Sequence, residues 1–367
     1  MDAKREFQNA EQDNRDERVA FTRRNWTGRF LRAEVTYGDY QRIMSKISTW
    51  DQWLPAWTEI ALEYERHAKS AEERGGRHSA AEAWRRAAMC WHFGKFNWFE
   101  DLDKARHAQV RLTECYAKAI WSLTPPGKKV FIPYGGAEIS GILRIPAGLK
   151  YPPVVLLIGG LDSVKEELQI VADYFLRREI ATLAIDGPGQ GETAARLNIE
   201  PASEMPVKAV IDFLEGVKEV DAQRLGVYGQ SLGGYYVIRA SAFEKRIKAA
   251  IDSAGPYAVA DHWDKLPPMT RAGYQHRLGA DGPQQALEYV RKLDLAGIAE
   301  KVSCPLLVMH GTADAVVPVS NAERIAEEAQ AAVLWKFEGG NHSLSNRHWE
   351  ARNGMADWMA ERIGGRL

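Results

Sequence analysis

The chain has 367 residues, of which 45% are hydrophobic and 26% are charged. This length exceeds a single ordinary domain, and the composition is that of a globular protein, which excludes a disordered, collagen-like or membrane-spanning chain. Because 48 Lys and Arg residues nearly balance 49 Asp and Glu residues, no overall charge indicates nucleic acid or an anionic membrane as a partner.

The first third of the chain has a helical pattern. Apolar residues recur at spacings of three and four within residues 57–64 and again within residues 81–92, which is the period of an amphipathic helix. Ser79 follows a Gly-Gly break and is the expected N-cap of the second of these helices. Residues 100–120 supply a third long helix. We therefore expect residues 1–123 to form an all-helical N-terminal domain.

This helical region is rich in tryptophan, with Trp26, Trp50, Trp53, Trp57, Trp84, Trp91 and Trp98. Large aromatic side chains usually fill the core between packed helices, and we favour that interpretation. The alternative is that some of them line an aromatic pocket over a site.

The helical periodicity ends at Pro125-Pro126-Gly127, and short β-rich runs then alternate with amphipathic helical stretches. The expected strands are residues 130–133, 139–145, 154–158, 181–185, 225–228, 249–252, 306–310 and 333–337, of which the first two form a hairpin. This alternation predicts an α/β fold with a mostly parallel eight-stranded sheet over residues 124–367. Residues 256–301 exceed the length that one connection needs, so we expect an insertion there.

The strand expected at residues 154–158 leads into Gly159-Gly160-Leu161-Asp162. The two glycines leave the backbone bare, so its N–H groups can point at a developing negative oxygen. We expect the N–H groups of Leu161 and Leu232 to form an oxyanion hole, and Gly160 and Asp162 to contact substrate. The alternative is a turn that only lets the chain leave the sheet.

The loop after the next strand reads Asp186-Gly187-Pro188-Gly189-Gln190-Gly191-Glu192. It lacks the lysine of a phosphate-binding P-loop and the spacing of a dinucleotide fingerprint. We interpret it as a structural turn near the site, and we expect no nucleotide cofactor.

A serine within a Gly-x-Ser-x-Gly pattern follows the strand expected at residues 225–228. The stretch is Gly229-Gln230-Ser231-Leu232-Gly233, with a helical pattern after it. A strand, a sharp turn and a helix in this order form a nucleophile elbow, in which small residues flank the serine because larger ones would collide with neighbouring backbone. The alternative is a glycine-rich turn with an inert serine.

A nucleophilic serine needs a general base, which in turn needs a carboxylate to orient it. Asp314 follows the seventh expected strand, and His342 follows the eighth. The order serine, aspartate, histidine along the chain is that of the α/β-hydrolases. Asp252, which ends another strand, is the alternative acid, and His310 is expected to pack behind the site.

These motifs resemble the α/β-hydrolase superfamily, and more narrowly its branch containing 2,6-dihydroxypseudooxynicotine hydrolase and the fermentation-respiration switch proteins. The narrower resemblance rests on a helical domain before the hydrolase core and on three stretches, which begin at Gly159-Gly160-Leu161-Asp162-Ser163-Val164-Lys165-Glu166-Glu167, Asp186-Gly187-Pro188 and Gly229-Gln230-Ser231. It implies a helical cap over a Ser-Asp-His site, a homodimer, and hydrolysis of a carbon–carbon bond beside a ketone in an aromatic substrate.

Members of this branch can use an extra acidic residue from the segment after the sixth strand. That segment reads Asp261-His262-Trp263-Asp264 here and lies in the expected insertion. We expect His262 and Trp263 to contact substrate.

Three scattered cysteines, Cys90, Cys115 and Cys304, have no metal-ligand spacing. They predict no zinc site and a reducing compartment. Residues 1–18 are charged and have no apolar run, and eighteen apolar residues occur together nowhere in the chain, so we expect no signal peptide, no membrane span and a cytoplasmic protein.

The leading hypothesis is a serine hydrolase without metal or cofactor that acts through an acyl-enzyme on a small aromatic or ketone-containing substrate, breaking a carbon–carbon bond. Hydrolysis of an ester, thioester or amide is the alternative within enzymes. A non-catalytic ligand-binding or interaction protein on a hydrolase fold is the alternative from another class.

Overall fold

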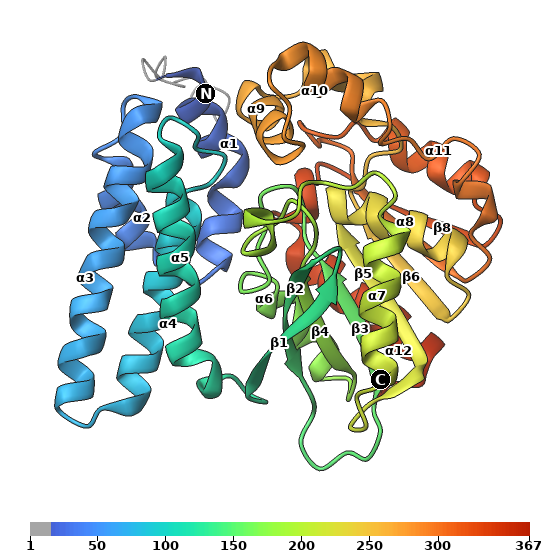
Figure 1. Cartoon of the computed structure of the whole chain (residues 1–367), viewed down its shortest axis with the longest axis horizontal. Helices are drawn as coiled ribbons and strands as arrows, with labels where there is room; N and C mark the ends of the chain where they lie inside the picture. Colours follow the sequence, from blue (N-terminus) through green and yellow to red (C-terminus); the bar gives the residue numbers. More distant parts are fainter. Residues whose placement is uncertain (1–15) are drawn as a thin grey trace, which may run out of the picture.

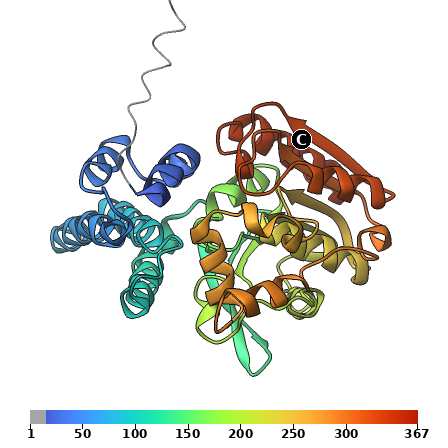
Figure 2. The ribbon, with the colours of Figure 1, turned by 90° about the horizontal axis from the view of Figure 1, so that it is seen from above.

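The computed structural model describes residues 16–367, which form a helical domain beside an α/β domain (Figure 1). The first fifteen residues of the expected helical domain, and most of the charged segment 1–18, lie outside the described residues. Seen from above, the two domains lie next to each other, and α9 and α10 cover the part of the α/β domain nearest the helices (Figure 2).

Five helices and two short 3-10 turns make up the helical domain: α1 (Glu17–Arg32), α2 (Tyr37–Met44), η1 (Trp50–Gln52), α3 (Trp53–Glu73), α4 (Arg77–Gly94), α5 (Leu102–Ala119) and η2 (Ile120–Ser122). Tryptophans fill the space between them, as the favoured interpretation of the sequence expects. Trp50 and Trp53 stack with ring centroids 4.9 Å apart, and Trp57 is fully buried beside them.

The start of α4 differs from the expectation. Gly75 (φ +74°) ends the preceding helix, and the N–H of Gly76 donates to the carbonyl of Ala71 at 2.8 Å. The chain then re-enters a helix at once, with Gly76 as the N-cap and Arg77 as the first helical residue. Ser79 therefore lies inside the helix, and its expected role as N-cap is wrong.

The α/β domain contains one eight-stranded sheet, in the order β1-β2-β4-β3-β5-β6-β7-β8. The strands are β1 (Gly127–Tyr134), β2 (Ala137–Arg144), β3 (Pro153–Ile158), β4 (Ala181–Asp186), β5 (Asp221–Gln230), β6 (Ile247–Ser253), β7 (Leu306–Gly311) and β8 (Ala332–Phe337). The first two form an antiparallel hairpin, β2 pairs antiparallel with β4, and all other pairs are parallel. The predicted mostly parallel eight-stranded sheet with a leading hairpin is confirmed.

Helices cover both faces of the sheet: α6 (Gln169–Leu176) and α12 (His348–Ile363) on one face, and α7 (Glu204–Glu215), α8 (Leu232–Phe243) and α11 (Ser320–Glu328) on the other. Alternate residues of a strand point to opposite faces. In β3, Val155 and Leu157 pack in the first layer, whereas Val154 and Leu156 pack in the second. This two-sided burial explains why the central strands have nearly continuous apolar sequences.

Residues 256–301 lie between β6 and β7. They contain η4 (Val259–Lys265), α9 (Pro268–Arg277), α10 (Pro283–Val290) and η5 (Ala299–Lys301). This segment reaches the helical domain, because the Thr22 hydroxyl of α1 lies 3.5 Å from the sulfur of Met269 in α9. Within residues 16–367, no helix is both long and apolar enough to cross a bilayer.

Candidate active site

Ser231 occupies the sharp turn between β5 and α8, with φ +55° and ψ −123°. The turn leaves no room for side chains on its neighbours. A Cβ at Gly229 would lie 2.0 Å from the carbonyl oxygen of Gly233, and one at Gly233 would lie 2.3 Å from that of Ile158. Only glycine fits these positions, so the local sequence forms the strained elbow that exposes a serine at a helix N-terminus.

The three residues predicted for catalysis lie within hydrogen-bonding distance of one another. The Ser231 hydroxyl is 3.0 Å from Nε2 of His342, and Nδ1 of His342 is 2.7 Å from Oδ2 of Asp314. Asp314 follows β7, and His342 begins the short turn η6 (His342–Leu344) after β8. The loops after β5, β7 and β8, which are distant in sequence, therefore meet at the carboxyl-terminal ends of the strands.

Asp314 has hydrogen-bonding partners on both carboxylate oxygens. Oδ1 accepts from the N–H groups of Val316 and Val317 at 2.8 and 2.9 Å, while Oδ2 faces His342 and also lies 3.3 Å from Nε2 of His310. Burial opposes ionisation, but the two nearby imidazoles hold the pKa of Asp314 well below its usual value. This carboxylate can remain ionised and hold one tautomer of His342.

Asp252, the alternative acid, does not contact His342. Its Oδ1 accepts one hydrogen bond, from the N–H of Gly255 at 2.8 Å, and its Oδ2 has no partner in the described chain. Burial raises the pKa of Asp252 to about 7, against the opposing effect of His310. The geometry favours Asp314 as the partner of His342.

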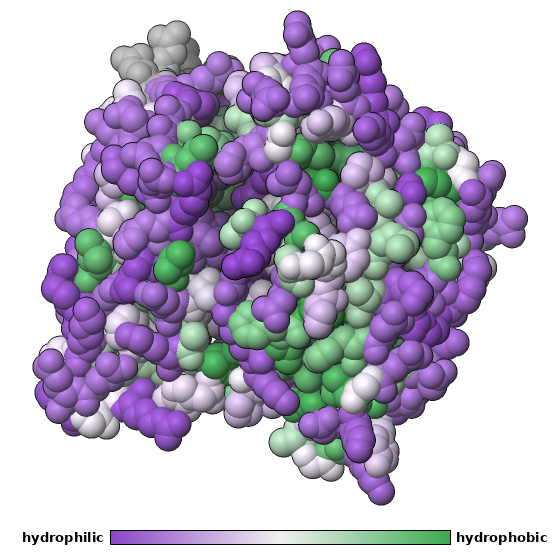
Figure 3. All heavy atoms as spheres, in the orientation of Figure 1, coloured by the Kyte–Doolittle hydropathy of each residue, from purple (hydrophilic) through white to green (hydrophobic). Residues whose placement is uncertain are grey.

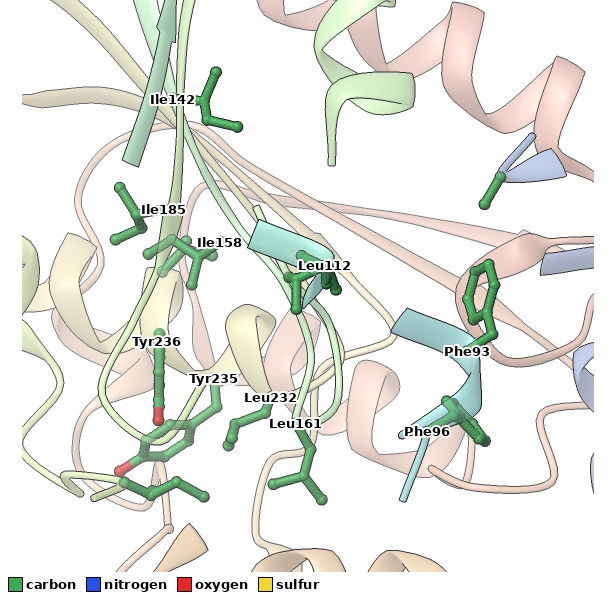
Figure 4. Packing of buried hydrophobic residues seen from close by; sticks show 14 of the residues in the cluster. Phe93, Phe96, Leu112, Ile142, Ile158, Leu161, Ile185, Leu232, Tyr235 and Tyr236 are labelled. Atoms are coloured by element: carbon green, nitrogen blue, oxygen red, sulfur yellow. The ribbon is translucent and has the colours of Figure 1, made fainter. Parts of the chain in front are cut away.

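The loop after β3, residues 159–163, is called the oxyanion loop below. A Cβ at Gly160 would lie 3.0 Å from the Cβ of Ser231, so this loop passes directly beside the serine. The N–H of Ser231 donates to the carbonyl of Ser253, whereas no hydrogen bond to another described residue engages the N–H of Leu161 or Leu232. In Figure 4, Leu161 and Leu232 lie between the Tyr235–Tyr236 pair and Phe93 and Phe96 of the helical domain.

Gln190 holds the oxyanion loop in place, which the sequence analysis did not predict. Its Nε2 donates to the carbonyls of Gly159 and Gly160 at 2.6 and 2.9 Å, and its Oε1 accepts from the N–H of Gly187. From the sequence, residues 186–192 are interpreted only as a turn near the site. The indication that the sequence offers is the position of this loop, which follows β4 and therefore lies at the same end of the parallel strands as Ser231.

A buried ion cluster joins α1 to the oxyanion loop. The Arg29 guanidinium is 2% exposed and donates to both carboxylate oxygens of Glu167 at 2.6 Å and to Asp162 at 2.6 Å. It also donates to the Ser163 hydroxyl at 3.2 Å. His92 of α4 lies 3.0 Å from Glu167. Asp162, expected to contact substrate, is therefore paired with an arginine of the helical domain.

The same helix crosses the loop that carries His342. The Trp26 ring meets the His342 imidazole edge to face, with centroids 5.5 Å apart. A Cβ at Gly28 would lie 3.4 Å from the Ser345 hydroxyl. Among the ring pairs of the described chain, Trp26 is the one predicted tryptophan that faces a candidate catalytic residue.

His262 and Trp263 lie in η4 and are 5% and 7% exposed. Burial lowers the pKa of His262, and neither side chain hydrogen-bonds to Ser231, Asp314 or His342. Trp263 packs against Tyr274 of α9, with ring centroids 6.1 Å apart. The acidic neighbour Asp261 is exposed and faces Arg324 at 3.8 Å.

Among residues 16–367, no group of three or more His, Cys, Asp or Glu side chains is arranged to hold a metal ion. The chemical groups gathered at the sheet edge are a serine hydroxyl, an imidazole, a carboxylate and backbone N–H groups. This set is suited to acyl transfer.

Comparison with known proteins adds three findings. A family profile described as "Esterase FrsA-like" matches residues 40–364. The 2,6-dihydropseudooxynicotine hydrolase of Paenarthrobacter nicotinovorans is 32% identical over 340 residues, covering 91% of this chain and 90% of that protein. Esterase FrsA of Vibrio parahaemolyticus is 24% identical over 286 residues, covering 75% of this chain and 68% of that protein.

The fold matches a solved structure of similar length. The crystal structure of the 2,6-dihydroxy-pseudo-oxynicotine hydrolase has a TM-score of 0.84 and 30% sequence identity to this chain, covering 93% of this chain and 97% of the other. The match includes the helical domain as well as the sheet.

Proposed function

The chain belongs to the FrsA-like esterase family of α/β-hydrolases, and from this membership we propose that it hydrolyses a carbon–carbon bond beside the carbonyl of a small aromatic ketone, with Ser231 as nucleophile. The observation that carries the proposal is the continuous relay from Ser231 through His342 to Asp314, at 3.0 and 2.7 Å. Nucleophile, base and orienting carboxylate need these distances to transfer a proton.

In the proposed first step, the Ser231 oxygen attacks the substrate carbonyl carbon, and its proton moves to Nε2 of His342. Asp314 holds Nδ1 and stabilises the imidazolium that forms. The N–H groups of Leu161 and Leu232 hold the negative oxygen, and the N-terminus of α8 adds a favourable dipole. Gln190, which fixes the carbonyls of Gly159 and Gly160, keeps the first of these donors oriented.

In the second step the tetrahedral intermediate collapses and the bond to the leaving group breaks. The leaving carbon takes the proton from His342, which leaves the acyl group on Ser231. Water, deprotonated by His342, then attacks this acyl-enzyme and releases a carboxylic acid. Because a carbanion is a poor leaving group, we expect a substrate in which an electron-rich aryl ring or a second carbonyl delocalises the charge.

The extra acidic residue of this branch has no clear counterpart here, because Asp261 faces solvent and Arg324. His262 is the buried titratable group of that segment. We propose that His262 and Trp263 contact the leaving group, and that Gly160 lies beside the reacting carbonyl.

Hydrolysis of a carboxylic ester is the second candidate, favoured by the esterase relatives. The two reactions share the acyl-enzyme and differ in the leaving group. We would offer aryl ketones and aryl esters in parallel and measure the mass added to Ser231. Loading by ketones supports carbon–carbon hydrolysis, loading by esters alone supports the second candidate, and loading by neither favours a non-catalytic binding protein.

All the groups in this mechanism come from the chain, so we expect activity to survive dialysis against a chelator. Loss of activity that a divalent ion restores would overturn the mechanism.

We also propose that residues 1–123 cap a catalytic domain of residues 124–367, with residues 256–301 as an insertion. The contacts of Trp26 and Arg29 with the site support the cap.

We further propose a homodimer, as the family resemblance implies. Exposed apolar side chains support it, since Val333 of the edge strand β8 is 46% exposed and Trp349 of α12 is 73% exposed. Edge strands with exposed apolar residues are prone to pair with another chain. Light scattering should give twice the mass of one chain, and Trp349→Lys should lower it; a monomer at all concentrations would contradict the proposal.

A further inference from the structure

Two cationic side chains near the oxyanion loop, one from each domain, lack a carboxylate of their own. Lys95, which follows α4, is 9% exposed and forms no ion pair or hydrogen bond through its ammonium with any residue of the described chain. Arg277, at the end of α9, donates from Nη1 to the carbonyl of Gly189 at 2.5 Å, while its Nε is buried without a partner. Burial and the Arg277 guanidinium lower the pKa of Lys95 to about 8.

The nearest carboxylates form direct ion pairs with other cations. Asp162 pairs with Arg29 at 2.6 Å, and Asp186 pairs with the buried Lys165 at 2.9 Å. Both carboxylates still act electrostatically on Lys95 and Arg277. Buried charges are normally paired, because leaving water is costly for an isolated ion. Arg29 also pairs with Glu167, and Lys165 also pairs with Glu166 and Glu192. Lys95 and Arg277 therefore offset these carboxylates at longer range, but neither has a direct ion-pair partner among the described residues.

A third polar group connects this position to the reacting serine. Oδ1 of Asn97, a residue that is 5% exposed, has no hydrogen-bond partner among the described residues. A Cβ at Gly273 of α9 would lie 2.9 Å from this atom and 3.1 Å from Cδ2 of Leu161. Leu161 in turn follows Gly160, which lies against Ser231. Gly273 of α9 thus lies against both Asn97 and the side chain of Leu161.

A solvent-accessible opening lies between the helical domain and α9. A groove of about 500 Å³ is lined by Phe99, Leu102, Ala272, Gln275 and His276, together with residues 279–281. The rings of Phe99 and His276 face each other at 5.0 Å. Figure 3 shows a recess between the mostly hydrophilic helical domain and α9. In the sequence, Asn97 precedes the lining residue Phe99 by two positions, and Arg277 directly follows the lining residue His276.

We propose that Lys95 and Arg277 form a subsite for an acidic oxygen substituent of the substrate, either a carboxylate or an ionised ring hydroxyl. The proposal deepens the proposed function and rests on it only in placing the substrate carbonyl at Ser231. Ammonium and guanidinium groups donate charge-assisted hydrogen bonds to such oxygens, and these are stronger when water is excluded. The helical domain would then select substrates by charge while the sheet edge carries out the chemistry.

The test measures binding to the full-length Ser231→Ala variant, in which hydrolysis does not interfere. The first probe pair is 4-acetylbenzoate and its methyl ester; the second is ionised 4-hydroxy-3-nitroacetophenone and its methyl ether. Calorimetry should show the charged member of at least one pair binding about tenfold or more tightly than the neutral member. The pair that shows the preference identifies which oxygen the subsite takes.

Lys95→Gln in the same background should abolish most of this preference, and Lys95→Arg should retain it. The matched control is Lys69→Gln, the same change at an exposed lysine of α3, which should leave the preference intact. If Lys95→Gln does not fold, Lys95→Arg and the parent variant still decide the matter through the charged and neutral probes.

Three outcomes would overturn the subsite: equal affinity for charged and neutral probes, no saturable binding of either charged probe, or a preference that Lys95→Gln leaves unchanged. These outcomes are separate from failure of the proposed function. Absence of an acyl group on Ser231 in the parent protein would refute the hydrolase while leaving the binding measurement interpretable.

Discussion

The carboxylate of Asp314 receives hydrogen bonds on both oxygens, whereas that of Asp252 receives one, and this difference separates two acids that the sequence leaves as alternatives. Both residues end or follow a central strand, so chain position alone does not distinguish them. The difference arises from the turn after β7, which directs the N–H groups of Val316 and Val317 at Asp314.

Exchange of each acid for its amide should separate their roles. Asp314→Asn should lower kcat by about 10⁴-fold, because an amide holds the wrong tautomer of His342. Asp252→Asn should have a much smaller effect, since Asp252 does not contact His342. Steady-state kinetics on an activated aryl ester would compare the two variants. A larger loss for Asp252→Asn would show that the assignment of the acid is wrong.

Ser231 and His342 should act as one unit. Ser231→Ala and His342→Ala are each expected to lower kcat by roughly four to six orders of magnitude, to nearly the same residual rate, and the double variant should fall little further. The reason is that the base has no function once the hydroxyl that it activates is gone. Losses that multiply in the double variant would contradict this shared role.

At the scale of secondary structure, all eight predicted strands are present, and the central ones are predictable because buried parallel strands have continuous apolar sequences. The boundaries are less accurate where polar residues begin a strand. The fifth strand is expected at residues 225–228, whereas β5 begins at Asp221, paired with Pro153. Serine, aspartate and histidine could be located because each follows a predictable strand end.

The contribution of α1 to the site could not be predicted in this way. Periodicity identifies a buried face of a helix but not the surface that the face covers. Arg29 and Glu167 are 138 positions apart in sequence, and nothing local to either residue indicates the other. The same limitation applies to Gln190, whose hydrogen bonds to Gly159 and Gly160 depend on the parallel pairing of β3 with β4.

The Arg29 cluster should be important for stability. Arg29→Met would leave the buried Glu167 and the partly buried Asp162 without their cation, at a cost of about 3–5 kcal/mol. Urea denaturation should show a lower midpoint with an unchanged slope. Arg42→Met is the matched control, because Arg42 pairs with Glu63 at the exposed surface and should change the midpoint little. Equal effects of both variants would contradict the assigned role of Arg29.

The same cluster predicts how stability depends on acid. Burial opposes ionisation of Glu167, but Arg29 and His92 hold its pKa well below its usual value of 4.5. Such a group stabilises the fold above the unfolded pKa, and this stability is lost as pH falls through the folded pKa. Glu167→Gln should therefore flatten the decline of the free energy of unfolding between pH 5 and pH 3, within the approximate range set by this linkage. A decline as steep as that of the parent would refute the prediction.

At the scale of the whole molecule, α1 touches the oxyanion loop through Arg29, the loop of His342 through Trp26, and α9 through Thr22. His342 is only 4% exposed. We therefore expect a bulky substrate to reach His342 only when the helical domain and the α/β domain separate.

Locking the two domains together should test this separation. Because a Cβ at Gly28 would lie 3.4 Å from the Ser345 hydroxyl, Gly28→Cys with Ser345→Cys places two thiols near disulfide geometry. The native cysteines are buried and should not interfere. The oxidised variant should lose activity on a bulky aromatic ketone more than on a small activated ester, and reductant should restore it. Full activity on both substrates after oxidation would contradict the need for separation.

The Arg29 cluster also restricts how this protein can exchange parts with its relatives. The arginine is encoded near the start of the chain, and its two carboxylate partners are encoded in the catalytic half. A gene formed by recombination between the two halves would encode one side of the cluster without the other. A chimera with a foreign helical domain would therefore have Asp162 and Glu167 without their cation, close to the loop that passes beside Ser231. Helical domains of this family should be transferable only together with the matching segment 159–167, so that the two halves are inherited as a single unit.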